Sequence, residues 1–179
     1  MSRALVIVDI QRDYFPGGAH PLHEPEAAAA AARRVLERFR ADREPLIHIQ
    51  HVWNEPNAPF FRSGTEGVEI HPDVAPAGGE LVIRKGAPNA FLRTALEAAL
   101  RSRGAQELVI CGMMTSMCVD ATVRAASDLG FTVTLVHDAC AAPSLSFDGV
   151  EVPAPAVHAA FLGALAEGYA SVVEAASVR

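Results

Sequence analysis

The stretch "ELVICGMMTSMCVDATVRAASDLGFTVTLV" (Glu107–Val136) holds two apolar runs on either side of a segment with helical periodicity. The first run, "LVIC" (Leu108–Cys111), is continuous, as is typical of strands that are buried on both faces of a sheet, and the second, "FTVTLV" (Phe131–Val136), is rich in residues that favour strands. Between them, Thr115 or Ser116 can cap a helix, and Gly130 can end it. The stretch therefore predicts a strand–helix–strand unit, which is the building block of a parallel sheet.

The rest of the chain repeats this alternation of strands and helices. The expected strands cover residues 4–8, 45–52, 80–84, 107–111 and 131–136, with a weaker one over 170–173. Other helical patterns begin near Pro25, Asn89 and Pro155. Because the links are short, we predict an α/β fold, a three-layer α/β/α sandwich around a mostly parallel six-stranded sheet. A length of 179 residues fits one domain over residues 1–179.

Composition excludes several classes of function. The net charge is -6 and the sequence pI is about 5.6, which argues against a nucleic-acid partner. No apolar run approaches the roughly 20 residues of a membrane span, and the N-terminal apolar run is too short for a signal peptide. Three cysteines without a C-x-x-C pair suggest neither disulfides nor a zinc cluster. We therefore expect a cytoplasmic protein without a membrane partner.

Two stretches interrupt the alternation, residues 14–24 and 53–79, and both are rich in Gly, Pro and His. The second is long for a connection without secondary structure, and such loops are usually functional or mobile. It carries Trp53, Phe60 and Phe61, which suit a pocket wall or a contact between subunits.

Polar side chains follow three of the predicted strands. Asp9 follows the first strand, Lys85 follows "LVIR", and the turn after Cys111 delivers Cys118 to a helix start. Ligands of parallel α/β sheets bind at the carboxyl ends of the strands, so these side chains share the functional edge. A thiol near a helix N-terminus and a cation has a lowered pKa, and a carboxylate can accept its proton. The set is sufficient for covalent acyl transfer.

Each of these residues also has a purely structural interpretation. Asp9 could form a turn, Lys85 could be a solvated strand end, and Cys118 could be packed in the core. For Cys111 and Cys140, burial is the better interpretation. The joint placement of an acid, an amine and a thiol favours chemistry over three separate structural roles.

Three motifs in the expected order resemble the isochorismatase-like cysteine hydrolases, a family that includes nicotinamidases and N-carbamoylsarcosine amidohydrolases. The motifs are "ALVIVDIQRDYFPGG", "VIRKGAPNAF" and "VICGMMTSMCVDATVRAASDLGF". The resemblance implies that Asp9, Lys85 and Cys118 are catalytic. It also implies a cis peptide bond between Met113 and Met114, and an oxyanion hole formed by the N–H groups of Met114 and Cys118. The implied substrate is a small amide, carbamoyl or ureido compound that is hydrolysed through a thioester.

The resemblance also bears on metals and assembly. Nicotinamidases carry an Asp-x-His pair after the second strand, and "HIQHVWNEP" lacks it, so we expect no metal and no cofactor. His48 and His51 are three apart in a strand and point to opposite faces. Isochorismate cleavage is disfavoured because that branch of the family does not use a cysteine nucleophile. Family members commonly form homo-oligomers, so a dimer or tetramer is expected.

Substrate contacts follow from loop position alone. We expect the pocket to be lined by Phe15, Trp53, Phe60, Phe61 and Thr115. Two alternatives to an amidohydrolase remain open. The protein could be a catalytically idle family member that serves as a binding or assembly module, or a redox protein that uses Cys118 as a peroxide-sensitive thiol. The complete Asp9, Lys85 and Cys118 set disfavours the first, and the lack of an evident resolving cysteine weakens the second.

Overall fold

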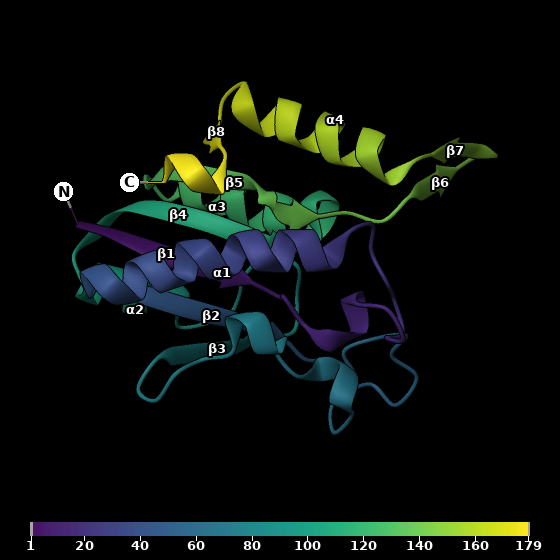
Figure 1. The fold of residues 1–179 in the computed structure, drawn as a ribbon, viewed down its shortest axis with the longest axis horizontal. Coiled ribbons are helices and arrows are strands. Elements are labelled where there is room, and N and C mark those ends of the chain that lie inside the picture. Colours follow the sequence, from purple (N-terminus) through teal and green to yellow (C-terminus); the bar gives the residue numbers. More distant parts are fainter. Residues whose placement is uncertain (1, 179) are drawn as a thin grey trace.

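The computed structural model describes residues 2–178 and contains a six-stranded sheet whose neighbouring strands are all parallel (Figure 1). The strands are β1 (Ser2–Val8), β2 (Leu46–His51), β3 (Leu81–Lys85), β4 (Ala105–Met113), β5 (Thr132–Ala141) and β8 (Ser171–Val173). Their order across the sheet is β3-β2-β1-β4-β5-β8. The predicted six-stranded parallel sheet is confirmed.

Helices cover both faces of the sheet. They are α1 (Pro25–Asp42), α2 (Leu96–Ser102), α3 (Asp120–Asp128) and α4 (Ala154–Ala166). Alternate residues of β1 face opposite layers, because Leu5 and Ile7 pack with the core under α1, whereas Val6 and Val8 pack with side chains of α2 and α3. The three-layer architecture is therefore confirmed. None of the helices in residues 2–178 is both long and apolar enough to cross a membrane.

The strand order reverses beside β1, which pairs with β2 on one side and with β4 on the other. At such a switch point, the loops that leave the two central strands turn to opposite faces and open a crevice at the carboxyl edge. Asp9 leaves β1 at this crevice, and the segment that bears Cys118 leaves β4 there. The topology thus places the candidate residues on both sides of the position where α/β sheets bind ligands.

One predicted helix is shorter than expected. The pattern starting at Asn89 predicts a helix from that point, but the α-helix begins only at Leu96. The N–H of Ala90 donates to the Thr122 hydroxyl of α3 (3.1 Å), and this contact holds the preceding segment in a series of turns. As a result Leu92, which the pattern placed on the buried face, is 50% exposed.

A two-stranded antiparallel hairpin, β6 (Leu145–Phe147) and β7 (Val150–Val152), was not predicted. It extends away from the sheet next to the start of α4 (Figure 1). Strands of three residues are too short to show a hydrophobic alternation, which explains the omission. Phe147 at its tip is 85% exposed.

The expected assembly into a dimer or tetramer stays a prediction.

An ion-pair network ties three elements together at the edge away from the candidate site. The Glu80 carboxylate, just before β3, accepts two hydrogen bonds from the Arg40 guanidinium of α1 (2.7 and 2.8 Å). It also accepts the Ala77 N–H (2.8 Å) and lies 2.9 Å from Nε2 of His48 on β2. The guanidinium contributes most to holding the pKa of Glu80 at about 2.

We expect the Glu80→Gln variant to lower the free energy of unfolding at pH 7 by about 1–2 kcal/mol, because it replaces charge-assisted bonds by weaker ones. A depressed carboxyl pKa stabilises the fold above the unfolded-state value near 4.5, and this contribution is lost as the pH falls toward 2. Urea unfolding of wild type and variant at pH 7 and pH 2.5 measures the difference, which should shrink in acid.

The control for Glu80 is Glu97→Gln, which removes one exposed i,i+4 ion pair with Arg101 (3.7 Å). Exposed pairs of this kind contribute about 0.5 kcal/mol or less. A destabilisation by Glu80→Gln that is no larger than the control, or that does not depend on pH, would contradict the assignment.

Candidate active site at the carboxyl edge of the sheet

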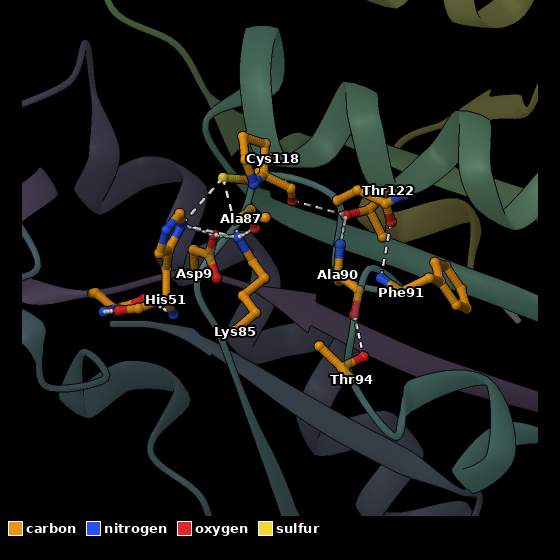
Figure 2. A network of polar contacts seen from close by, with 12 residues as sticks. Asp9, His51, Lys85, Ala87, Ala90, Phe91, Thr94, Cys118 and Thr122 are labelled. Atoms are coloured by element: carbon orange, nitrogen blue, oxygen red, sulfur yellow. Dashed lines mark hydrogen bonds and ion pairs between the residues drawn. The ribbon is translucent and has the colours of Figure 1, made fainter. Parts of the chain in front are cut away.

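Four adjacent chain segments deliver polar side chains to one buried cluster (Figure 2). Asp9 follows β1, His51 ends β2, and Lys85 ends β3. Cys118 lies in a π-helical segment, Thr115–Val119, between β4 and α3. His51 and Lys85 are direct register partners in the parallel β2–β3 pair, so their side chains leave the sheet on the same face.

The structure brings the three predicted catalytic side chains into contact. The Lys85 ammonium nitrogen lies 2.7 Å from Oδ2 of Asp9 and 3.3 Å from Sγ of Cys118. The ammonium also donates to the carbonyl of Ala87 (2.9 Å). All three catalytic candidates are buried, with Cys118 only 3% exposed. A carboxylate, an ammonium and a thiol that are distant in sequence therefore form one network.

The protonation state of Cys118 differs from the sequence-based expectation of a lowered pKa. Burial raises the pKa of this thiol, the nearby Asp9 carboxylate raises it further, and Lys85 opposes both more weakly. The expectation rested on the helix terminus and the cation, and it did not include the cost of desolvating a thiolate. Cys118 is thus a thiol at neutral pH, and it can act as a nucleophile only if a base takes its proton.

Asp9 can accept that proton. Its N–H is fixed by the carbonyl of Ile49 (3.1 Å), and its side chain is fully buried. Within residues 2–178, neither carboxylate oxygen accepts a hydrogen bond; Oδ2 forms the ion pair with Lys85 and lies 3.7 Å from Nδ1 of His51. One oxygen of Asp9 lies within 4.8 Å of Sγ of Cys118. The carboxylate therefore has free lone pairs close to the thiol.

Backbone N–H groups of the predicted oxyanion hole line the turn after β4. The peptide bond between Met113 and Met114 is cis, as the resemblance implied. The Met114 N–H donates to no partner in the part of the chain that the structure describes. The carbonyl oxygen of Met114 accepts hydrogen bonds from the N–H groups of Met117 and Val119 (both 3.1 Å). It accepts none from the N–H of Cys118. This bonding pattern is compatible with an oxyanion bound by Met114 and Cys118.

Two of the predicted substrate-binding aromatics contact the cluster. The Trp53 ring lies 4.7 Å from the His51 ring, centroid to centroid, and the Phe61 ring lies 5.9 Å from it. The Trp53 indole nitrogen and Nε2 of His51 are buried and have no hydrogen-bond partner in residues 2–178. Buried polar groups are normally hydrogen-bonded, so these unpaired groups near Cys118 are candidates for binding a ligand.

The other three predicted contacts lie against different partners. Phe60 stacks on His20 (4.8 Å between ring centroids), and Phe15 stacks on His71 (3.8 Å). The Thr115 hydroxyl is 2.9 Å from Nδ1 of His158 on α4. Their role as substrate contacts stays a prediction.

Sequence reasoning missed two residues of this cluster, His51 and Tyr14. Tyr14 is fully buried, and its hydroxyl has no partner in residues 2–178. Its ring packs against Phe61 (4.5 Å between centroids), and its pKa is raised first by burial and then by the charges of Cys118 and Asp9. His51 lies inside the predicted strand 45–52, so the strand-end rule does not select it, and the sequence suggests it only as a possible metal ligand.

The cluster does not fit a metal ion well. Asp9, His51 and Cys118 each offer a ligand atom, and these atoms lie within 4.8 Å of one another. However, the Lys85 ammonium lies 2.7, 3.0 and 3.3 Å from these same three side chains. A divalent cation would have to displace this fixed positive charge. The absence of a metal and of a cofactor stays a prediction.

The fold and the cluster together define a three-layer α/β protein with a buried cysteine beside a carboxylate and an ammonium, and comparison with known proteins identifies the family. The model of the isochorismatase domain matches residues 3–177, and the chain belongs to the isochorismatase family of hydrolases. The isochorismatase family protein YddQ of Bacillus subtilis is 47% identical over 172 residues, which cover 96% of each chain.

Further similarity comes from an enzyme and from a solved structure. A streptothricin hydrolase of Streptomyces noursei is 37% identical over 137 residues, which are 76% of this chain and 49% of that protein. A crystal structure assigned as an isochorismatase hydrolase from Oleispira antarctica is 43% identical. It superposes with a TM-score of 0.96, covering 99% of this chain and 95% of that one. The predicted family and fold are therefore confirmed.

Proposed function

We propose that the protein is a cysteine amidohydrolase that cleaves the C–N bond of a small amide, carbamoyl or ureido compound through a thioester on Cys118. The observation that carries the proposal is the Asp9–Lys85–Cys118 network, with Lys85 Nζ at 2.7 Å from the acid and 3.3 Å from the sulfur. A base, a nucleophile and a cation in contact supply the groups that covalent acyl transfer requires.

In the first half of the reaction, Asp9 takes the thiol proton as the sulfur of Cys118 attacks the substrate carbonyl carbon. The carbonyl oxygen becomes an oxyanion, which accepts hydrogen bonds from the N–H groups of Met114 and Cys118. The C–N bond then breaks, and protonated Asp9 gives its proton to the leaving nitrogen. A raised thiol pKa suits this sequence, because attack and proton transfer to Asp9 occur together.

In the second half, water attacks the thioester carbonyl while Asp9 takes one of its protons. The same two N–H groups hold the second oxyanion. The C–S bond breaks, the acid is released, and the proton on Asp9 returns to the sulfur. Lys85 keeps its positive charge throughout and offsets the negative charge that moves between Asp9, the sulfur and the oxyanion.

A cavity beside Lys85 supports a small substrate. Its volume is about 380 Å³, close to the lower end of the range for small-molecule sites. It is lined by Val52, Asn54, Ser63, Arg84, Lys85, Gly86, Ala87, Leu92 and Arg93. Lys85 and Ala87 connect the cavity wall to the catalytic network, since the ammonium donates to the Ala87 carbonyl. We infer that the substrate approaches through this cavity.

The test is a screen of small primary amides, carbamoyl compounds and ureido acids, read out as ammonia release, with the Cys118→Ala variant as control. We expect turnover by the wild type only, and a mass increase on Cys118 equal to the acyl fragment when the reaction is quenched in acid. If folded wild type releases no ammonia from any compound in these classes, or if Cys118→Ala is equally active, the proposal is wrong.

A further inference from the structure

Two sets of contacts hold His51 in the cluster. The buried side-chain amide of Gln11 accepts a hydrogen bond from the His51 N–H (2.8 Å) and donates one to the His51 carbonyl (2.9 Å). The imidazole packs against the Trp53 and Phe61 rings, whose centroids are 4.7 and 5.9 Å away. The ring is therefore fixed in place beside Lys85, its register partner on β3.

The contact with Lys85 determines the tautomer of His51. Nδ1 lies 3.0 Å from the ammonium nitrogen, and an ammonium group can only donate. Nδ1 must therefore be an acceptor, which makes the imidazole neutral with its proton on Nε2. The ring cannot donate to Lys85, so its role toward that residue is to receive one of its N–H bonds.

The ammonium of Lys85 has three protons and three hydrogen-bond acceptors. They are Nδ1 of His51 (3.0 Å), the carbonyl of Ala87 (2.9 Å) and Sγ of Cys118 (3.3 Å) (Figure 2). Oδ2 of Asp9 is closer at 2.7 Å, but it forms an ion pair without hydrogen-bond geometry. With two N–H bonds committed to His51 and Ala87, tetrahedral geometry directs the third at the sulfur.

We propose that His51 is a positioning residue of the reaction, whose Nδ1 orients the Lys85 ammonium so that one N–H bond points at Sγ of Cys118. Without this acceptor, the ammonium can turn toward the Asp9 carboxylate and away from the sulfur. The thiolate that forms as Asp9 takes the proton would then lose a charge-assisted hydrogen bond. The inference rests on the proposed function, but its main test needs no substrate.

The alternative is that His51 is only a packed core histidine. His48 on the same strand provides the comparison, since it is equally buried but faces the other side and bonds to Glu80 (2.9 Å). Substitution of either histidine disturbs a buried position on β2. Only substitution of His51 should change the chemistry of Cys118.

Three substitutions of His51 distinguish the contribution of Nδ1 from that of Nε2. In His51→Asn the side-chain oxygen can take the place of Nδ1, in His51→Gln the longer side chain places its polar group near Nε2, and His51→Ala has neither. His48→Gln is the matched control. Each full-length variant is treated with iodoacetamide at pH 7 to 9, a range below the raised pKa of the Cys118 thiol, in which the alkylation rate follows the thiolate fraction. Modification is assigned by peptide fragmentation, because Cys111 and Cys118 lie between the same tryptic sites, Arg103 and Arg124.

We expect the alkylation rate of Cys118 at each pH to be unchanged in His51→Asn and His48→Gln. It should fall about tenfold in His51→Gln and His51→Ala, because weakening a charge-assisted bond to the thiolate raises the pKa of the thiol by about one unit. Altered access to the sulfur would change the rate in all three His51 variants, so recovery in His51→Asn separates the two causes. With a substrate from the screen, kcat should fall about tenfold or more in the same two variants, with a smaller change in KM.

The proposal is overturned if His51→Asn slows the alkylation of Cys118 as much as His51→Ala, or if none of the variants slows it. It is also overturned if His51→Gln is closer to wild type than His51→Asn, since the role would then belong to Nε2. Thermal unfolding of each variant shows whether the protein is folded under the labelling conditions. The expected pattern of alkylation rates in a protein that hydrolyses no tested amide would refute the proposed function and retain the role of His51 toward Lys85.

Discussion

Replacing Asp9 by asparagine is expected to lower kcat by about 10³-fold or more, because the substitution removes the group that takes the thiol proton and returns it to the leaving nitrogen. Asparagine keeps the shape of the side chain and lacks basicity. Burial keeps Cys118 protonated in the free protein, so a thiolate does not form in advance to compensate. The measurement is kcat for ammonia release from a substrate found in the screen.

Asp9→Asn also has a large expected effect on stability. Lys85 would remain buried, 4% exposed, without its carboxylate at 2.7 Å. Breaking a buried ion pair by removing one partner typically costs about 3–5 kcal/mol, because an uncompensated charge is left in the interior. Loss of activity through unfolding must therefore be separated from loss of the base.

The double variant Asp9→Asn, Lys85→Met makes this separation. It removes both charges, so urea unfolding should show a substantial recovery of stability relative to Asp9→Asn alone. Activity should stay absent, since neither the base nor the cation is restored. Recovery of turnover together with stability would show that Asp9 has only a structural role, and the proposed mechanism would fail.

The catalytic candidates could be predicted because their positions follow from topology. In a parallel sheet, every residue that directly follows a strand reaches the same edge, so Asp9 and Lys85 could be selected from apolar runs alone. Cys118 required one more step, the turn that starts the next helix. Each of the three lies within a few residues of the end of a strand, so the position of that strand largely determines where the side chain lies.

The parts of the site that could not be predicted depend on contacts between distant segments. Tyr14 reaches the cluster because residues 9–15 fold back under the long loop, where Asp13 accepts the N–H of Phe61 (2.6 Å). No periodic pattern encodes such a loop path. The pKa of Cys118 depends on its burial and on the charges of Asp9 and Lys85, and these also follow from tertiary packing.

The boundaries of helices and strands could likewise be predicted where the local sequence decides them, but not where tertiary contacts do. Strand cores were placed correctly, whereas the segment after Asn89 was predicted as helix because its apolar spacing fits one. The hydrogen bond from the Ala90 N–H to the Thr122 hydroxyl contributes to overriding this local preference for a helix. β4 and β5 each extend beyond the predicted run at their carboxyl ends, to Met113 and Ala141, and there they pair with each other beside the site.

Gly112 is the residue at which substitution is expected to disrupt fold and site together. It pairs in register with Val8, and its backbone φ is +139°, a conformation that side chains rarely adopt. A Cβ atom at this position would lie 2.0 Å from the carbonyl oxygen of Val8 and 2.8 Å from its nitrogen. These contacts involve backbone atoms in the middle of the sheet, so relief requires that β1 and β4 separate.

We expect Gly112→Ala to lower the free energy of unfolding by about 3–5 kcal/mol, from backbone strain together with steric overlap. The control is Gly79→Ala, which has φ +90° but no atom within 4 Å of the added Cβ, so it isolates the strain and should cost about 1 kcal/mol. Urea unfolding of both variants measures the difference. Because Val8 precedes Asp9 and Gly112 precedes the Met113–Met114 turn, any Gly112→Ala protein that remains folded should also lose most of its turnover. Equal stability of the two variants would mean that the close approach of β1 and β4 is not required, and that the base and the oxyanion donors are positioned by other contacts.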